Sequence, residues 1–367
     1  MIINRLSFEG YRNLSNGEIF PCENVNVIYG KNAQGKTNLL EALWLFSGNR
    51  SFRGAKDSEF IGFDKNKASI YIDFFSEDRM QNAEIVYQKG KKEVKLNGVK
   101  QSSVNKLLGK LCIVVFSPEH LSLVKRGPSE RRKFIDSAVC QIRPNFSDTL
   151  SEYNRLLVQR NALLKDLPYH SDLLDTMEIW EERLAVYGAA VIRMRINYVQ
   201  QLNTFSKRYH SGISDGREEL NISYQCEFPE EIFSDREKLI GSYIKKLRET
   251  RKDDIKDGST SIGPHRDDLF LEINGESLRS FGSQGQQRSS VLSMKIAEAE
   301  LIKQATEQEP IVLLDDVLSE LDSRRQEFLL NKISDRQVFI SCCERASADR
   351  LEGGKLFYVE KGEVMPV

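Results

Sequence analysis

The sequence predicts an α/β protein: a phosphate-binding-loop head with a mixed sheet, flanking helices and an antiparallel β part, and an inserted α-helical arm. Three observations predict this fold. The apolar run Val25–Tyr29 leads into Gly30–Thr37, which has the form G-x-x-x-x-G-K-T, and then into an apolar helix. Residues 68–96 contain strand-like runs in which apolar and polar side chains alternate, which is typical of antiparallel strands. Residues 145–198 repeat apolar side chains every three or four positions, which predicts long helices.

The head is predicted to begin with short strands and one helix. Residues 1–29 contain strand-like runs around the turn Asn13–Gly17, and Thr37 opens a helix whose apolar side chains recur as far as Phe46. Asn97-Gly98 is a hairpin signal. The further strands predicted in this part of the chain are Ala68–Phe75, Ala83–Gln88, Glu93–Leu96 and Leu111–Phe116.

A helical region follows Pro118. Its two apolar stripes, broken at Pro168–Ser171, predict an antiparallel helical hairpin in which Arg160 takes one core position. The stripes fit a subdomain that packs on itself, and they also fit an arm that binds a partner. A strand at Leu220–Tyr224 and a helix at Asp235–Lys252 follow. We therefore predict three parts: head residues 1–117, arm residues 118–260, and head residues 261–367.

The composition is that of an ordinary globular protein. Of 367 residues, 40% are hydrophobic and 29% charged, and 53 basic against 54 acidic side chains leave a net charge of −1. Nucleic-acid binding would therefore depend on local basic patches. The six cysteines show no C-x-x-C spacing, which disfavours zinc and redox motifs. No apolar run approaches a membrane span and Met1 leads into a strand-like run, so we expect a cytoplasmic protein without membrane contact.

The loop after the first buried strand is predicted to bind ATP. Its glycines allow a tight turn that brings backbone N–H groups against phosphate oxygens, and the helix N-terminus adds the positive end of its dipole. The Lys36 ammonium would reach the β- and γ-phosphates, and the Thr37 hydroxyl would ligate Mg²⁺. The predicted nucleotide-binding residues of this loop are Gly30, Lys31, Asn32, Ala33, Gln34, Gly35, Lys36 and Thr37.

A second buried strand, Pro310–Leu314, ends in the carboxylates Asp315 and Asp316. Ligands of an open parallel sheet bind at the carboxyl ends of its strands. Asp315 is therefore predicted to hold Mg²⁺, directly or through water, and Asp316 to orient or deprotonate an attacking water. The alternative is that the two acids only open the next loop.

Two further motifs surround this strand in the sequence. Ser283, Gln284, Gly285 and Gln286 form a Ser-x-Gly-Gln turn at the start of a helix that runs to about Thr306, and such a turn is a second anion-binding nest. Ser319-Glu320-Leu321-Asp322 follows the acidic strand end. One nucleotide needs only one phosphate loop, so the second cradle calls for an explanation.

The four motifs in this order resemble the ATP-binding-cassette (ABC) ATPases. The resemblance implies that the signature Ser283–Gln286 of one head contacts the γ-phosphate held by the loop of another head, with Ser319 and Asp322 in the adjoining D-loop. Two ATP molecules would then lie in the interface of a symmetric homodimer. Binding of ATP at the interface would favour the associated state.

The likeness extends along nearly the whole chain to one group of these ATPases. Phe8–Leu14, Gly30–Asn38, Phe116–Glu119, Leu123–Lys125, Arg131-Arg132, Gly263–Asp268, Ser283–Arg288 and Leu314–Asp322 resemble the RecF family of bacterial DNA replication and repair proteins. The resemblance implies recognition of gapped DNA or of junctions between single and double strands. It also implies that RecO and RecR partners help to load RecA, that ATP drives dimerisation and DNA binding, and that slow hydrolysis releases the dimer.

Several positions depart from the wider ABC pattern. Asp316 stands where a Glu is usual, which fits slow turnover. The strand Val338–Ile340 leads to Ser341-Cys342-Cys343, so no switch His is assigned, and the role of Glu119 stays open. The resemblance implies that Asn38, which follows the phosphate loop, also belongs to the nucleotide-binding residues. Arg12 either reaches the nucleotide, as N-terminal arginines do in related heads, or forms a surface salt bridge.

Three basic clusters are candidates for DNA contact. One cluster is favoured for DNA contact because few acidic residues lie near it in the sequence. It comprises Lys125, Arg126, Arg131, Arg132 and Lys133, and the other two clusters lie at residues 89–95 and 245–252. Binding through such residues would be directed to phosphates and sensitive to salt. The alternative for each cluster is a solvated face balanced by acids.

The main rival function is the ATPase subunit of an ABC transporter, which tends to be more compact between its two nucleotide motifs. A nuclease with a cassette head is a third reading, disfavoured because no further metal-binding constellation is evident in the sequence.

Overall fold

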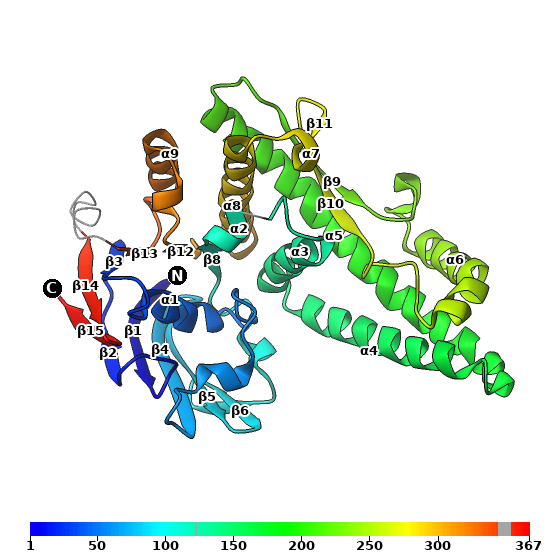
Figure 1. Cartoon of the computed structure of the whole chain (residues 1–367), viewed down its shortest axis with the longest axis horizontal. Coiled ribbons are helices and arrows are strands. Elements are labelled where there is room, and N and C mark those ends of the chain that lie inside the picture. Colours follow the sequence, from blue (N-terminus) through cyan, green and yellow to red (C-terminus); the bar gives the residue numbers. More distant parts are fainter. Residues whose placement is uncertain (122, 344–353) are drawn as a thin grey trace. The chain divides into compact units, whose positions relative to one another are not determined.

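The computed structural model describes residues 1–121, 123–343 and 354–367. Backbone contacts divide the chain into two compact units (Figure 1). The first comprises Met1–Leu123, Phe205–Glu219 and Gly282–Val367, and the second comprises Val124–Thr204 and Leu220–Phe281. The two units are described separately below.

The first unit contains an antiparallel sheet with the strand order β2-β1-β4-β5-β6-β7. In β4 and β5, side chains alternate between buried and more exposed positions, as the sequence predicts for strands with one face on a core. The hairpin between β6 and β7 turns at Asn97-Gly98, where Asn97 has a φ of +51°. The strands are β1 (Ile2–Glu9), β2 (Gly17–Ile19), β4 (Lys67–Ser76), β5 (Arg79–Gln88), β6 (Lys91–Leu96) and β7 (Val99–Gln101).

A second sheet in this unit has the order β15-β14-β3-β13-β12-β8, and all neighbouring pairs except β14–β15 are parallel. Strands β3, β8, β12 and β13 are almost wholly buried, which explains their mostly apolar sequences. The strands are β3 (Val25–Tyr29), β8 (Ile113–Phe116), β12 (Ile311–Asp315), β13 (Val338–Cys342), β14 (Lys355–Glu360) and β15 (Glu363–Pro366).

Helix α1 (Lys36–Leu45) lies in the core of the first unit. One hydrophobic cluster combines α1 side chains such as Leu40 with Ile70 of the antiparallel sheet and Leu313 of the parallel sheet. Helix α8 (Gln284–Thr306) contacts β8. Shorter segments complete the unit: η1 (Asp57–Phe60), η2 (Val104–Leu107), α2 (Pro118–Leu121), η5 (Leu318–Glu320) and α9 (Ser323–Ile333).

The second unit contains the predicted helical hairpin. Helix α4 (Asn145–Asp166) and helix α5 (Met177–Ser214) are its two arms, and the 3-10 helix η3 (Ser171–Thr176) precedes the second (Figure 1). The α-helix therefore begins later than the apolar stripe at Leu173 predicted. The last turns of α5, from Phe205, belong to the first unit.

Around the hairpin lie α3 (Pro128–Ile142), α6 (Arg236–Asp257), η4 (Glu230–Ile232), α7 (Leu278–Phe281) and the sheet β11-β10-β9. Its strands are β9 (Leu220–Gln225), β10 (Asp268–Ile273) and β11 (Glu276–Ser277). Because β10 pairs with β9, residues 261–281 stay with the second unit. The compact units therefore differ from the predicted boundaries here, at 118–123 and at 205–219.

Arg160 occupies the core position that the hairpin pattern predicts. Its guanidinium is fully buried and lies 3.0 Å from a carboxylate oxygen of Glu181 on α5 and 2.8 Å from one of Asp254 on α6. Thr260 accepts a further hydrogen bond from it at 2.8 Å. Buried charges require such partners, and these join three helices.

The Gly263–Asp268 block also lies inside the second unit. His265 donates from Nε2 to the Thr260 carbonyl at 3.0 Å and accepts at Nδ1 from the Tyr153 hydroxyl at 2.6 Å. A Cβ at Gly263, where φ is +121°, would lie 1.8 Å from the Tyr243 hydroxyl oxygen, so only glycine fits there. Burial lowers the pKa of His265 to about 4, so the ring is neutral at pH 7.

Candidate functional site

The phosphate loop joins β3 to α1 at the carboxyl edge of the parallel sheet. Gly30 has a φ of +154°, and a Cβ there would lie 2.2 Å from the Val359 carbonyl oxygen, so the position requires glycine. Gln34 accepts at Oε1 from the Lys361 N–H at 2.6 Å. These contacts fix the loop against strand β14 and the turn after it.

Lys36 is almost completely buried within this loop, with 4% of its side chain exposed. Its ammonium donates to the Gly30 carbonyl at 2.7 Å and to the Lys31 carbonyl at 3.3 Å, and lies 3.7 Å from the Cys343 sulfur. The loop therefore holds the positive charge that the motif predicts among its own backbone groups.

The loop and the acidic strand end meet through Thr37 and Asp315. The Thr37 hydroxyl donates to Asp315 Oδ1 at 2.9 Å, and the Ser341 hydroxyl donates to the same oxygen at 2.9 Å. The pKa of the Asp315 carboxyl is raised to about 6, chiefly by burial; the hydrogen bonds from the Thr37 and Ser341 hydroxyls oppose the rise, and the negative charges of Asp316 and Glu119 contribute to it.

Asp316 follows in the left-handed region with a φ of +50°, and its side chain is half-buried. Its backbone N–H donates to the Ser341 hydroxyl oxygen at 2.9 Å, and its carbonyl accepts from the Ser319 hydroxyl at 2.7 Å. The D-loop serine is thus tied to the second acid. A non-glycine residue with this backbone persists only where its surroundings hold it.

Oxygen ligands suited to Mg²⁺ are present at this edge. Asp315 accepts only hydroxyl hydrogen bonds from the described residues, and the carboxylates that act on its pKa are also negative. A hard divalent cation between the Thr37 hydroxyl and the Asp315 carboxylate would offset that charge. In the described ranges no group of three or more His, Cys, Asp or Glu side chains is arranged to hold a metal, so the remaining ligands would come from phosphate and water.

The signature residues lie at the start of α8. The Ser283 hydroxyl caps the helix by accepting a hydrogen bond from the Gln286 N–H at 3.2 Å. The Gln286 side chain in turn accepts a hydrogen bond from the Ser283 N–H at 2.9 Å. Ser283 and Gln284 are exposed, and Gln286 donates to Glu218 at 3.0 Å. No hydrogen bond in the described ranges joins this turn to the phosphate loop of the same chain.

Asp322 of the D-loop caps α9 by accepting from the Arg325 N–H at 3.0 Å, and it also pairs with the Arg325 guanidinium. Arg325 bonds to Ser289 at 2.8 Å and to the Gly285 carbonyl at 3.4 Å. The sequence did not single out Arg325, which links the D-loop to the signature helix.

Arg12 and Asn38 lie beside the phosphate loop in different roles. Arg12 pairs with the fully buried Glu41 of α1 at 2.5 Å, and its guanidinium lies 5.0 Å from the Phe60 ring centroid. The salt bridge of Arg12 is therefore buried and not at the surface as predicted, and a contact between Arg12 and nucleotide stays a prediction. Asn38 donates to Asn13 at 2.6 Å, which brings the N-terminal turn against α1.

The predicted DNA-contact set contains one residue that does not fit. Arg131 is 2% exposed, and its guanidinium forms a bidentate pair with Asp268 at 2.6 and 2.7 Å. A buried guanidinium that already holds a carboxylate is not available to a phosphate, so we remove Arg131 from that set. Lys125 and Arg126 are exposed.

The other two members of the set have partners in the second unit. Arg132 is half-buried and donates to the Asp267 carbonyl at 2.7 Å, and burial lowers its pKa. Lys133 is exposed and pairs with Glu130 at 2.7 Å. Exposed pairs of this kind contribute little to stability and exchange readily for other partners.

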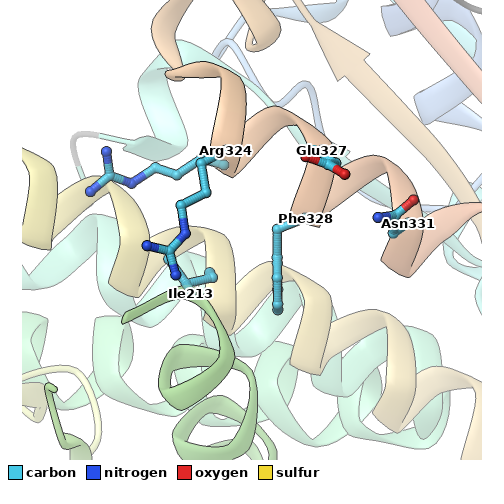
Figure 2. A pocket seen from close by; sticks show the side chains of 6 residues that line it. Ile213, Arg324, Glu327, Phe328 and Asn331 are labelled. Carbon is cyan, nitrogen blue, oxygen red and sulfur yellow. The ribbon is translucent and has the colours of Figure 1, made fainter. Parts of the chain in front are cut away.

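A cavity of about 180 Å³ lies beside α9, and Figure 2 shows Phe328 projecting from that helix into it. Arg324 pairs with Asp215, and Arg325 pairs with Asp322. Because carboxylates already hold both arginines, we do not assign the cavity to a phosphate ligand. Its lining residues are Ile213, Arg324, Arg325, Glu327, Phe328 and Asn331.

None of the described helices combines the length and the apolar character that crossing a lipid bilayer requires.

Comparison with known proteins identifies the family. The family model described as RecF/RecN/SMC N terminal domain matches residues 2–361. Proteins named DNA replication and repair protein RecF from Acetivibrio thermocellus and Agathobacter rectalis are each 41% identical to this chain. The first alignment spans 360 residues, 98% of each protein, and the second spans 367 residues, 99% of each protein.

Two solved structures support the same conclusion. They are titled as the recombination mediator protein RecF-ATPrS and RecF-ATP in the RecFOR pathway, and they share 36% and 37% of their residues with this chain. Their TM-scores are 0.94 and 0.92, and the matches cover 100% of this chain and 98% and 97% of those chains. An Smc head with 16% identity and a TM-score of 0.58 shares the fold. The predicted fold class, an ABC-type head with an inserted helical arm, is confirmed, and the chain belongs to the RecF family.

Proposed function

We propose that this chain is an ATP-dependent DNA-binding protein of recombinational repair and replication restart. The observation that carries the proposal is the 2.9 Å contact between Thr37 and Asp315, in a chain that matches RecF proteins over 98% of its length. A phosphate loop joined to an acidic strand end is the arrangement that binds and hydrolyses a nucleoside triphosphate. The names of the relatives indicate the biological process.

The residues from Gly30 to Asn38 hold ATP in this proposal. Backbone N–H groups of the loop and the N-terminus of α1 cradle the phosphates, and the Lys36 ammonium moves from the loop carbonyls to the phosphate oxygens. Thr37 and Asp315 hold Mg²⁺, which would neutralise charge on the β- and γ-phosphates. Asp316 orients the attacking water as a weak ATPase requires, and ADP and phosphate are the products.

ATP acts between two copies of the chain. Ser283 and Gln284 are exposed at the N-terminus of α8, and a second head can approach them. The γ-phosphate bound by one chain would accept hydrogen bonds from Ser283–Gln286 of the other, and Ser319 and Asp322 would line the same interface. The dimer is therefore isologous, and ATP stabilises it by binding at the contact.

The DNA ligand is gapped DNA or a junction of single and double strands. Lys125 and Arg126 are exposed, and Lys133 is held only by a surface pair, so these side chains can contact phosphates. Arg132 is retained as a secondary contact because its side chain is only half-buried. RecR- and RecO-type proteins are the partners in loading RecA, and the cytoplasm is the compartment that this role implies.

The transporter alternative is disfavoured. The full-length likeness is to RecF proteins, and the insertion between the nucleotide motifs is a helical hairpin matched by RecF structures.

A mobility-shift assay with gapped duplex and plain duplex of the same sequence tests the function. We expect retention of the gapped DNA that requires ATP and Mg²⁺, prefers the gap, and weakens as salt rises. The Lys36→Ala variant is the control for nucleotide dependence. Equal retention of the two DNAs with and without ATP, or no retention of either, would contradict the proposal.

A further inference from the structure

Ser341 connects both acids of the nucleotide site through one hydroxyl group. Its side chain is buried, with 1% exposed, at the end of β13. The Ser341 hydroxyl donates its proton to Asp315 Oδ1 at 2.9 Å. The Ser341 hydroxyl oxygen also accepts a hydrogen bond from the Asp316 backbone N–H at 2.9 Å. One side chain therefore constrains the carboxylate of the first acid and the backbone of the second.

The strand order explains why this position can reach both acids. Strand β13 lies between β3, which leads into the phosphate loop, and β12, which ends in Asp315. In the parallel register Ser341 is the partner of Asp315 on β12 and of Ile28 on β3. The end of β13 therefore lies between the phosphate loop and the two acids. A side chain at this position can affect how the loop and the acids are aligned with each other.

The bond to Asp315 restricts how that carboxylate turns. Oδ1 accepts from the hydroxyls of both Thr37 and Ser341, each at 2.9 Å. The Thr37 hydroxyl can give a lone pair to Mg²⁺ and still donate its proton to Asp315. Ser341 is the second of these two contacts, and it helps to hold the carboxylate plane in place, as outer groups do for metal ligands.

The bond from Asp316 restricts the direction of the second acid. Its backbone lies at a φ of +50°, a region that costs free energy for a residue with a side chain. Without Ser341 the Asp316 N–H would lose its partner, and the backbone could relax toward a negative φ. The carboxylate of Asp316 would then turn away from the position of the attacking water.

A purely structural hydroxyl is the alternative. Buried serines often donate to a nearby backbone group, and Ser293 of α8 does so by donating to the Ser289 carbonyl at 2.9 Å. Ser341 differs because its proton goes to a side-chain carboxylate at the site. The structural role predicts a loss of stability alone, whereas positioning predicts a loss of site chemistry in a folded protein.

We propose that Ser341 is a positioning residue of the ATP site, which orients Asp315 toward Mg²⁺ and holds Asp316 in the backbone conformation that aims its carboxylate. The inference rests on the proposed ATPase function. It assigns to the end of β13 a task in aligning both acids.

The test compares four variants with the wild-type chain. Ser341→Thr keeps the hydroxyl and Ser341→Val has the same shape without it, so the difference between these two isolates the hydroxyl from the packing cost. Ser341→Ala removes the hydroxyl without adding volume. Ser206→Ala is the control, because Ser206 is fully buried on α5 and its hydroxyl bonds to none of the described residues.

Three measurements are made on each protein: thermal unfolding gives the Tm, steady-state kinetics give kcat and KM for ATP, and titrations give the ATP affinity with Mg²⁺ and with EDTA. We expect Ser341→Val and Ser341→Ala to lose kcat by about 10- to 100-fold and to lose most of the gain in ATP affinity that Mg²⁺ gives. KM measured with Mg²⁺ should rise in step with the lost ATP affinity, because the KM of a slow ATPase is close to its dissociation constant. Ser341→Thr should stay close to Ser206→Ala in kcat and in the gain in ATP affinity that Mg²⁺ gives. This should hold even if Ser341→Thr and Ser341→Val have the same Tm.

Two outcomes separate this inference from the proposed function. If the wild-type chain binds and hydrolyses ATP and Ser341→Val matches Ser341→Thr in kcat and in the Mg²⁺ gain, Ser341 has no positioning role and the ATPase function stands. If the wild-type chain neither binds nor hydrolyses ATP, the ATPase function and the role of Ser341 both fail.

Discussion

The hydroxyl of Thr37 lies 2.9 Å from a carboxylate oxygen of Asp315, although 278 residues separate the two along the chain. The parallel order β3-β13-β12 brings them together, because the carboxyl ends of parallel strands share one edge of the sheet. Thr37 follows the loop after β3, and Asp315 ends β12. The substitutions predicted below to change ATP binding, hydrolysis or dimerisation follow from this meeting point and from the signature motif.

Lys36→Ala should weaken ATP binding by about 100-fold or more, since it removes two or more charge-assisted hydrogen bonds to phosphate. ATP-driven dimerisation should disappear with it. Titration with a fluorescent ATP analogue measures the first effect and sedimentation the second. Lys100→Ala, which removes an exposed lysine paired with Glu93, is the matched control. Dimers that still form with ATP in Lys36→Ala would contradict the assignment.

Asp316→Asn should preserve ATP affinity and slow turnover by at least about 100-fold, because an amide cannot accept the proton of the attacking water. The side chain keeps its size, so the strained backbone at this position is retained. Phosphate release under single-turnover conditions is the measurement. Turnover equal to that of the wild-type chain would show that Asp316 does not accept the proton of the attacking water.

Ser283→Arg should leave ATP affinity within about twofold of wild type, because an exposed substitution away from the loop changes free energies by only about 0.5 kcal/mol. The same change should abolish dimerisation, since the long side chain occupies the place of the partner's γ-phosphate. Ser334→Arg, at an exposed serine after α9, is the control for added charge. Sedimentation of both variants with ATP decides; a Ser283→Arg dimer would exclude the signature from the interface.

The stability of the protein should depend on the neutral state of His265. Burial lowers its pKa to about 4 from the usual 6.5, so between these values the unfolded chain binds a proton that the native protein does not. Stability therefore falls as the pH drops through this window, by about 1.4 kcal/mol per pH unit from this group. The nearby charges of Arg266, Arg132 and Asp254 are present in both proteins compared below.

Urea unfolding of the wild-type chain and of His265→Gln between pH 4 and pH 7 measures this contribution. The free energy of unfolding of His265→Gln should fall less steeply toward acid. Asp267, whose pKa burial raises to about 6, acts in the opposite direction in both proteins and cancels in the comparison. The exposed His170→Gln variant controls for the substitution itself. Parallel pH profiles for the wild-type chain and His265→Gln would contradict the assignment.

Arg160→Met should cost about 3–5 kcal/mol of stability, because it leaves Glu181 and Asp254 buried without this partner. Arg251 still pairs with Glu181, so the larger part of the cost falls on Asp254. Arg155→Met, which removes an exposed guanidinium paired with Glu152, should cost about 0–1 kcal/mol. Equal costs for the two variants in urea unfolding would show that the buried cluster does not stabilise the hairpin.

Local patterns in the sequence predicted the parts of the fold that depend on local physics. The alternation in β4 and β5, the buried runs of β3 and β12 and the stripes of α4 and α5 each report which face of an element is buried. The convergence of Thr37 and Asp315 was also predictable, because the topology of parallel sheets places strand ends together.

Contacts between distant residues were not predictable from such patterns. Arg131 was chosen for DNA because of its charge, yet its partner Asp268 lies 137 residues away and becomes a neighbour only when β10 packs beside α3. Ser341 lies near the end of a buried strand, where the sequence pattern alone assigns no role to a serine. A serine hydroxyl becomes informative only when the acids beside it are known.

Sedimentation velocity of the wild-type chain, with and without saturating ATP and Mg²⁺, tests most directly whether nucleotide joins two heads. We predict a monomer without nucleotide and a dimer with it, because the phosphates bound by one loop are completed by Ser283–Gln286 of the second chain. A protein that binds ATP and stays monomeric at saturation would contradict this dimer.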